Sequence, residues 1–114
     1  MTIRKIGPAG IPSLGLGTFR MNPGEAREMT LAALAEGYRH IDTAQAYENE
    51  AEVGEGLRAS PVPRSEVFVT TKILPKDFAP GDFRKATEAS LKALGTDYID
   101  LLLLHWPSKE VPLA

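Results

Sequence analysis

The 114-residue sequence contains no cysteine, which excludes a disulfide framework and a thiolate metal site. It has no basic run and a net charge of -2, so it lacks the electrostatic basis for binding nucleic acid. Its longest apolar run, residues 99–104, is interrupted by Asp100 and is far too short to span a bilayer. Residues 1–15 lack the apolar core of a signal peptide. We therefore expect a cytoplasmic protein that binds neither nucleic acid nor a membrane.

Strand-like and helix-like segments alternate along the chain. Strand character, either β-branched and apolar or ending in glycines, marks residues 11–19, 38–42, 67–72 and 98–107. Apolar residues at helical spacing mark 24–37, 49–60 and 79–95, with Asn49 as a possible N-cap of the second helix. Alternation of this kind predicts an α/β fold with about four parallel strands and three helices. The last strand is nearly all apolar, as expected when both faces are covered.

Two architectures share this alternation. A doubly wound nucleotide-binding sheet requires the pattern G-x-G-x-x-G after its first strand. Here Gly15 and Gly17 are followed by Thr18, Phe19 and Arg20, so the third glycine is absent. A (β/α)₈ barrel instead places its catalytic residues at the carboxyl ends of several strands.

Polar residues stand at three successive strand ends. They are Asp42, Lys72 and His105, and Tyr47 lies in the loop after the first of them. In a parallel barrel these side chains would converge on one rim, where an acid, a base, a histidine and a phenol suit proton transfer. Each residue alone has a structural interpretation as a turn, solvated or packing residue. Their joint occurrence favours a catalytic site.

His40 raises the question of a metal. It lies two residues before Asp42 on the same strand face, and His105 would be a third ligand in a metal-dependent barrel hydrolase. The chain has only two histidines and no cysteine, and His105 does not stand at a recognisable ligand spacing from the other two residues. We therefore expect no metal and interpret His40 as a hydrogen-bonded residue of the barrel interior.

Four segments of the chain resemble the aldo-keto reductases. They are GLGTF, HIDTAQAYENE, VFVTTK and GTDYIDLLLLHWP, in the order and spacing of that family. The D-T-A-x-x-Y-x-N-E and L-H-W-P patterns are each fairly specific. LGLGTFR, DTAQAYENEAEVGEGL and TTKI further resemble the bacterial 2,5-diketo-gluconate and methylglyoxal reductase branch.

The resemblance implies a (β/α)₈ barrel that reduces aldehydes and ketones with NADPH. Its catalytic tetrad corresponds to Asp42, Tyr47, Lys72 and His105. The positions it places near the cofactor are Gly17, Thr18, Phe19 and Asp42. Those it places around a small carbonyl substrate are Phe19, Tyr47, His105 and Trp106. Many members have an aromatic residue shortly after the lysine, whereas this chain continues with Ile73, Leu74 and Pro75.

Physical chemistry supports these roles independently of the family. Hydride arriving at a carbonyl carbon leaves negative charge on the oxygen, which then needs a proton and a hydrogen-bond donor. A cationic Lys72 beside the phenol of Tyr47 favours the phenolate form. Asp42 can pair with Lys72 and limit the cost of burying its charge. His105 can donate a hydrogen bond to the developing oxyanion.

The length of the chain limits this interpretation. A complete barrel needs about 250 residues, and its phosphate site usually comes from the loops after strands 7 and 8. We therefore expect residues 1–114 to form a single incomplete domain, the N-terminal half of a barrel with exposed strand edges. Its expected partner is the missing C-terminal half, or a second copy joined through those edges. The alternative is a non-catalytic fragment, or a cofactor-binding or scaffolding protein like the potassium-channel β subunits.

Overall fold

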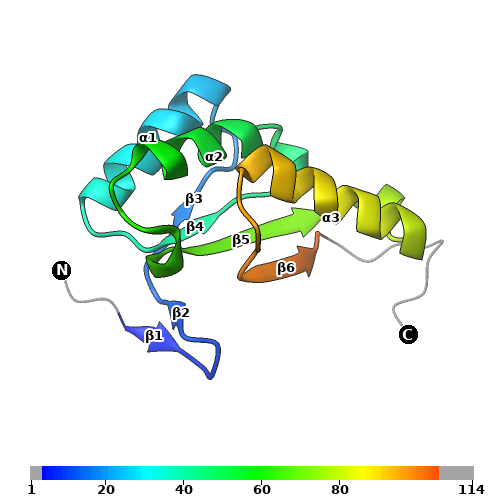
Figure 1. Cartoon of the computed structure of the whole chain (residues 1–114), viewed down its shortest axis with the longest axis horizontal. Helices are drawn as coiled ribbons and strands as arrows, with labels where there is room; N and C mark the ends of the chain where they lie inside the picture. The colour runs from blue at the N-terminus through cyan, green and yellow to red at the C-terminus, as the bar shows by residue number, and fades with distance from the viewer. Residues whose placement is uncertain (1–3, 106–114) are drawn as a thin grey trace.

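The computed structural model describes residues 4–105, which form a four-stranded parallel sheet and a separate two-stranded hairpin. The sheet has the order β3-β4-β5-β6, so each strand lies beside the next one along the chain. Figure 1 shows the sheet below the helices and the hairpin projecting from its lower end. The sheet strands are β3 (Leu16–Gly17), β4 (His40–Asp42), β5 (Phe68–Ile73) and β6 (Leu101–Leu104).

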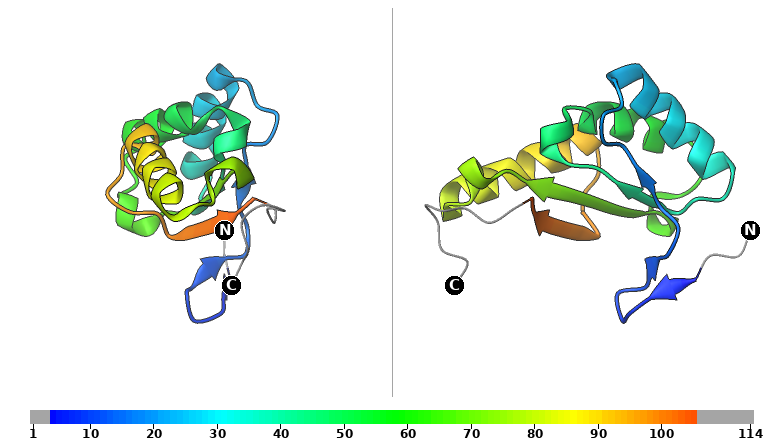
Figure 2. Two further views of the ribbon diagram at one scale, coloured as in Figure 1. Left: turned by 90° about the vertical axis from the view of Figure 1, so that its right-hand side faces the viewer. Right: turned by 180° about the vertical axis from the view of Figure 1, so that it is seen from behind.

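Three helices connect the sheet strands and cover one face of the sheet. They are α1 (Pro23–Ala35), α2 (Glu50–Ala59) and α3 (Pro80–Leu94). Both views in Figure 2 show the helices on the same side of the sheet, with the opposite face uncovered. The core lies between the two layers and consists mainly of Ala26, Leu34, Ile41, Val53, Leu57, Val67, Val69 and Leu94. This packing holds the strand ends at fixed positions relative to one another.

The helix boundaries follow from local chemistry. Asn22 caps α1 through a bond from the Glu25 backbone N–H (2.9 Å), and the Glu25 side chain completes a capping box. Gly95 ends α3 in the left-handed conformation, with φ of 66°. Gly54 lies inside α2 because a Cβ there would stand 2.5 Å from the Leu94 carbonyl oxygen. The glycine therefore allows α2 and the end of α3 to approach closely.

The fold class expected from the sequence is confirmed, with four parallel strands and three helices. The expectation of one strand over residues 11–19 is wrong. Ile11–Pro12 (β2) pairs antiparallel with Lys5–Ile6 (β1), and only Leu16–Gly17 (β3) joins the parallel sheet. The cause is the turn between β1 and β2, where Gly7 and Gly10 both have a φ of 68°.

Strand β6 forms one edge of the described sheet, since it pairs only with β5. Leu103 is 40% exposed and Leu104 is 42% exposed, so the expectation that both faces of this strand are covered is wrong for the described residues. The expectation of exposed apolar surface at a strand edge is met here. Within residues 4–105, no helix has both the length and the apolar character needed to cross a membrane.

Candidate active site

The carboxyl ends of the parallel strands form a common rim. Asp42 is the last residue of β4, Lys72 is the second-to-last residue of β5, and His105 directly follows β6. Tyr47 ends η1 (Gln45–Tyr47), a short 3₁₀ helix in the loop after β4. Asp42 is in register with Thr70 on β5, two residues before Lys72. Parallel pairing therefore brings residues far apart in the sequence to one end of the sheet.

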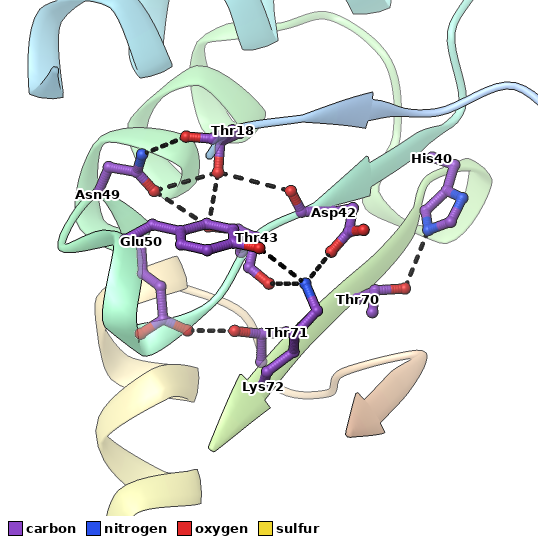
Figure 3. A network of polar contacts seen from close by, with 10 residues as sticks. Thr18, His40, Asp42, Thr43, Asn49, Glu50, Thr70, Thr71 and Lys72 are labelled. Carbon is purple, nitrogen blue, oxygen red and sulfur yellow. Dashed lines mark hydrogen bonds and ion pairs between the residues drawn. The ribbon is translucent and has the colours of Figure 1, made fainter. Parts of the chain in front are cut away.

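Lys72 is at the centre of the cluster. Its Nζ lies 2.5 Å from Asp42 Oδ1, 3.1 Å from the Thr43 carbonyl oxygen and 3.3 Å from the Tyr47 hydroxyl. An ammonium group has three donors, and here each has one oxygen acceptor. The Lys72 side chain is only 14% exposed, whereas that of Asp42 is 44% exposed. The cation is thus mostly buried and compensated by a carboxylate that stays accessible. Figure 3 shows the contacts of Lys72 with Asp42 and Thr43.

Tyr47 lies between two other rings. Its ring centroid is 5.2 Å from that of Phe19 and 5.8 Å from that of His105, the latter in an edge-on arrangement. Its hydroxyl oxygen accepts from Lys72, so the hydroxyl proton is left for another acceptor. Phe19 is 62% exposed and forms the outer wall of this group. The phenol can therefore donate its proton to an acceptor on the rim.

His105 is biased toward its neutral form. Burial lowers the pKa of the imidazole below its usual value, and the positive charge of Lys72 lowers it further, while Asp42 acts in the opposite direction. A neutral imidazole carries one N–H donor and one acceptor nitrogen. His105 can thus donate a hydrogen bond to an oxygen on the rim without adding a second positive charge beside Lys72.

The structure brings together the four residues that the sequence analysis grouped as a tetrad, Asp42, Tyr47, Lys72 and His105. Each of them lies in contact with at least one other.

The residues expected near the cofactor and substrate differ in accessibility. Gly17 and Phe19 are exposed, and a Cβ built on Gly17 would meet nothing within 4 Å. Thr18 is fully buried, so its side chain faces the protein interior rather than the rim. Trp106 lies outside the described residues. The binding roles of these residues stay predictions.

His40 has the hydrogen-bonded environment expected of an interior residue. Its Nε2 lies 2.9 Å from the Thr70 hydroxyl and its Nδ1 lies 3.4 Å from the Pro12 carbonyl oxygen. A carbonyl only accepts, so the contact with Pro12 is a hydrogen bond when Nδ1 carries the proton. Residues 4–105 contain no group of three His, Cys, Asp or Glu side chains that could hold a metal ion.

Two buried polar residues were not recognised from the sequence. Asn49 stands at the N-cap of α2 as expected, but its side chain makes no capping bond to the helix. Instead its Oδ1 accepts from the Thr18 and Thr43 hydroxyls, at 3.2 and 3.1 Å. The next residue, Glu50, is also buried, and burial raises the pKa of its carboxyl group. Two adjacent polar residues directly before the apolar positions of a helix are the signal that could have indicated such a role.

Comparison with known proteins gives a consistent family assignment. The sequence profile of the Aldo/keto reductase family matches residues 9–114. Glycerol 2-dehydrogenase (NADP(+)) of Saccharomyces cerevisiae is 47% identical over 104 residues, which cover 91% of this chain and 33% of that enzyme. Methylglyoxal reductase DkgB of Salmonella typhimurium is 47% identical over 98 residues, which cover 86% of this chain and 37% of that enzyme.

Solved structures agree with the sequence comparison. A crystal structure described as a putative 2,5-diketo-D-gluconic acid reductase B superposes with a TM-score of 0.94 at 46% identity. The match covers 97% of this chain and 40% of that one. This chain spans about a third of the length of the curated relatives it matches. Sequence and fold together show that the chain belongs to the aldo/keto reductase family.

Proposed function

We propose that the protein carrying this chain reduces aldehyde or ketone carbonyl groups to alcohols with NADPH, and that Tyr47 donates the proton. One observation carries the proposal: Lys72 Nζ lies between Asp42 Oδ1 (2.5 Å) and the Tyr47 hydroxyl (3.3 Å) on the strand-end rim. A phenol with a buried cation beside it is a proton donor whose conjugate base is stabilised. Membership of an oxidoreductase family supports the same reaction.

The residues of the rim fit a nicotinamide cofactor beside Tyr47. Asp42 keeps an accessible carboxylate, Phe19 presents an exposed ring, and the space beside Gly17 is open. These three residues would hold the part of the cofactor that lies near the reacting carbonyl, with Thr18 supporting them from below. NADPH, when bound, supplies a hydride to the carbonyl carbon. The relative named glycerol 2-dehydrogenase (NADP(+)) supports the choice of the phosphorylated cofactor.

The side chains of this chain would move one proton. Tyr47 gives its hydroxyl proton to the carbonyl oxygen as that oxygen gains negative charge, so that hydride and proton together form the alcohol. Lys72 stabilises the phenolate left behind, and Asp42 fixes Lys72 and compensates its charge. Neutral His105 donates a hydrogen bond to the same oxygen before the proton arrives. Phe19 and Trp106 would border the substrate.

The proposal also includes a partner segment and a location. The chain spans about a third of its relatives, so the loops that grip the cofactor phosphates in barrels fall outside it. We infer that the remaining strands of the barrel, in the same or another chain, complete the site along the exposed edge of β6. A cytoplasmic location is likewise part of the proposal and rests on the sequence composition.

Turnover tests this function directly. The protein, expressed at the full length that its gene encodes, is mixed with NADPH and a panel of small aldehydes and ketones that includes methylglyoxal. We expect loss of NADPH absorbance and one alcohol formed per NADPH consumed. NADPH binding without turnover across the panel would contradict the proposal and favour the cofactor-binding or scaffolding alternative.

A further inference from the structure

Two neighbouring side chains at the start of α2 are polar and almost fully buried. Asn49 is 1% exposed and Glu50 is 9% exposed. Burying an amide and a carboxyl group is unfavourable unless hydrogen bonds replace their contacts with water. Both residues have such bonds, and the bonds lead to the elements that carry the candidate active site (Figure 3).

Asn49 connects the first two strand ends. Its Oδ1 accepts from the hydroxyls of Thr18 and Thr43, and its Nδ2 donates to the Thr18 carbonyl oxygen at 2.8 Å. Thr43 directly follows Asp42, and Thr18 directly precedes Phe19. The carbonyl oxygen of Thr43 is also one of the three acceptors around Lys72 Nζ. A shift of Asn49 would therefore move the backbone that holds two sides of the rim.

Glu50 connects the third strand end to the loop that carries Tyr47. Its Oε2 accepts from the Thr71 hydroxyl at 2.6 Å, and its Oε1 accepts from the Ser90 hydroxyl at 3.2 Å. Thr71 directly precedes Lys72 in β5. Ser90 in turn accepts from Gln45 Nε2 at 3.0 Å, and Gln45 is the first residue of the short helix that ends at Tyr47.

We propose that Asn49 and Glu50 are positioning residues, which together set the distances between Asp42, Lys72 and Tyr47. The inference rests on the proposed function, because those three side chains are the ones assigned to proton transfer. Each side chain of the pair accepts a hydrogen bond from a threonine that is adjacent in sequence to a proposed catalytic residue. The two positioning residues are adjacent in the chain, so one peptide bond joins the two halves of the network.

Structural support alone does not account for this pair. A carboxyl group whose pKa is raised by burial is less stable in its charged form inside the protein than in water. Apolar side chains of similar volume would fill the same space without that penalty. What an apolar pair could not provide is directional bonds to Thr43, Thr71 and Ser90, and these fix geometry.

Three single variants test the proposal in the gene-length protein. Glu50→Ala removes both acceptor oxygens, and we expect kcat for carbonyl reduction to fall by about 100-fold with a much smaller change in KM. Glu50→Gln can still accept from one hydroxyl and donate to the other, so we expect it to recover most of that loss. Glu52→Ala changes another acidic residue of the same first helical turn and serves as the matched control, with kcat at the wild-type value.

A second measurement reads the geometry without turnover. The charge of Lys72 helps to lower the pKa of His105, so His105 reports on the place of Lys72. We expect Glu50→Ala to raise the pKa of His105, as measured by nuclear magnetic resonance. Glu52→Ala should leave that pKa unchanged. If Glu50→Ala does not fold, Thr71→Val removes one donor at nearly constant shape and should shift the His105 pKa in the same direction.

The outcomes separate this inference from the function it rests on. A wild-type protein that turns over no carbonyl compound overturns the proposed function, and a changed His105 titration would still support the positioning of Lys72. An active wild type whose Glu50→Ala variant keeps both kcat and the His105 pKa overturns the positioning role. Equal loss of kcat in Glu50→Ala and Glu52→Ala would also overturn it, because the effect would then belong to the helix as a whole.

Discussion

Two ion pairs lie at opposite ends of the same parallel sheet and differ in what surrounds them. Lys72 and Asp42 meet at the carboxyl ends of β5 and β4. Arg64 and Asp100 meet at the amino ends of β5 and β6, with Nη2 2.9 Å from Oδ2. Both pairs join consecutive strand–helix units, and in both the cation is mostly buried. Charge pairing by itself therefore does not distinguish a reactive site from a structural one.

The difference lies in the groups that each pair leaves available. Arg64 also donates to the carbonyl oxygens of Val67 and Tyr98 and to the Thr96 hydroxyl, and Asp100 Oδ2 also accepts from a backbone N–H. These partners lie in neighbouring loops, except for that N–H, which belongs to Val69 in β5. Asp42, by contrast, stays 44% exposed, and Lys72 contacts a phenol that keeps its own proton. The carboxyl end thus retains groups that can act on a bound molecule.

Replacing Lys72 by Met, at the carboxyl end of the sheet, should have the largest effect on kcat of the substitutions compared. The variant keeps the length of the side chain but removes the charge that stabilises a Tyr47 phenolate. We expect kcat for carbonyl reduction to fall by about 100-fold or more, the usual range for loss of assisted proton transfer. Steady-state kinetics of the gene-length protein measure it, and a loss below about threefold would contradict the assigned role.

Replacing Arg64 by Met should lower the stability of the protein and leave its kcat unchanged. It removes hydrogen bonds to Thr96, Val67, Tyr98 and Asp100 at the amino ends of the strands. We expect the free energy of unfolding to fall by about 1–3 kcal/mol, because partly buried acceptors lose their donor. Urea denaturation measures the loss, and kcat of the folded variant should match that of the wild type. A large kcat effect with unchanged stability would remove the distinction between the two ends.

Glu50 should make the free energy of unfolding depend on pH, which is a smaller effect than the two above. Burial raises its pKa above the ordinary 4.5, so the folded chain keeps this proton to a higher pH than the unfolded chain does. The folded state then binds more protons in that window, and the free energy of unfolding falls as pH rises through it. Glu50→Gln cannot titrate and should lack this decline. Thermal unfolding of the wild type and of Glu50→Gln, from below pH 4.5 to about pH 8, measures this decline in stability. The same dependence of Tm on pH in both proteins would contradict the assignment of the raised pKa to Glu50.

The sequence carried enough information to predict the rim but not all that supports it. Asp42, Lys72 and His105 follow recognisable strands, and parallel pairing alone is sufficient to place their side chains together. The hairpin was missed because Ile11–Pro12 is too short to show a strand pattern and pairs only with another two-residue strand. The available sequence signal was the pair of glycines, Gly7 and Gly10, which adopt positive φ in the turn.

The hydrogen bonds that support the rim could not be predicted, because a single sequence does not reveal which polar side chains are buried. Asn49 has the residue type and position of a helix cap, yet its side chain forms hydrogen bonds with Thr18 and Thr43, which directly follow β3 and β4. Glu50 is a residue type that is usually solvated in a first helical turn, yet its side chain is buried and accepts a hydrogen bond from Ser90 of α3. The Arg64 contacts join two loops that are far apart in sequence. Only packing of the layers decides these partners.

The central claim is that Tyr47 donates the proton to the carbonyl oxygen. The most direct measurement compares kcat of Tyr47→Phe with that of the wild type at saturating NADPH, with Tyr98→Phe at the opposite end of the sheet as the control. We predict that Tyr47→Phe loses about two to four orders of magnitude while Tyr98→Phe retains wild-type turnover. A folded, NADPH-binding Tyr47→Phe protein that reduces carbonyls as fast as the wild type would contradict the claim.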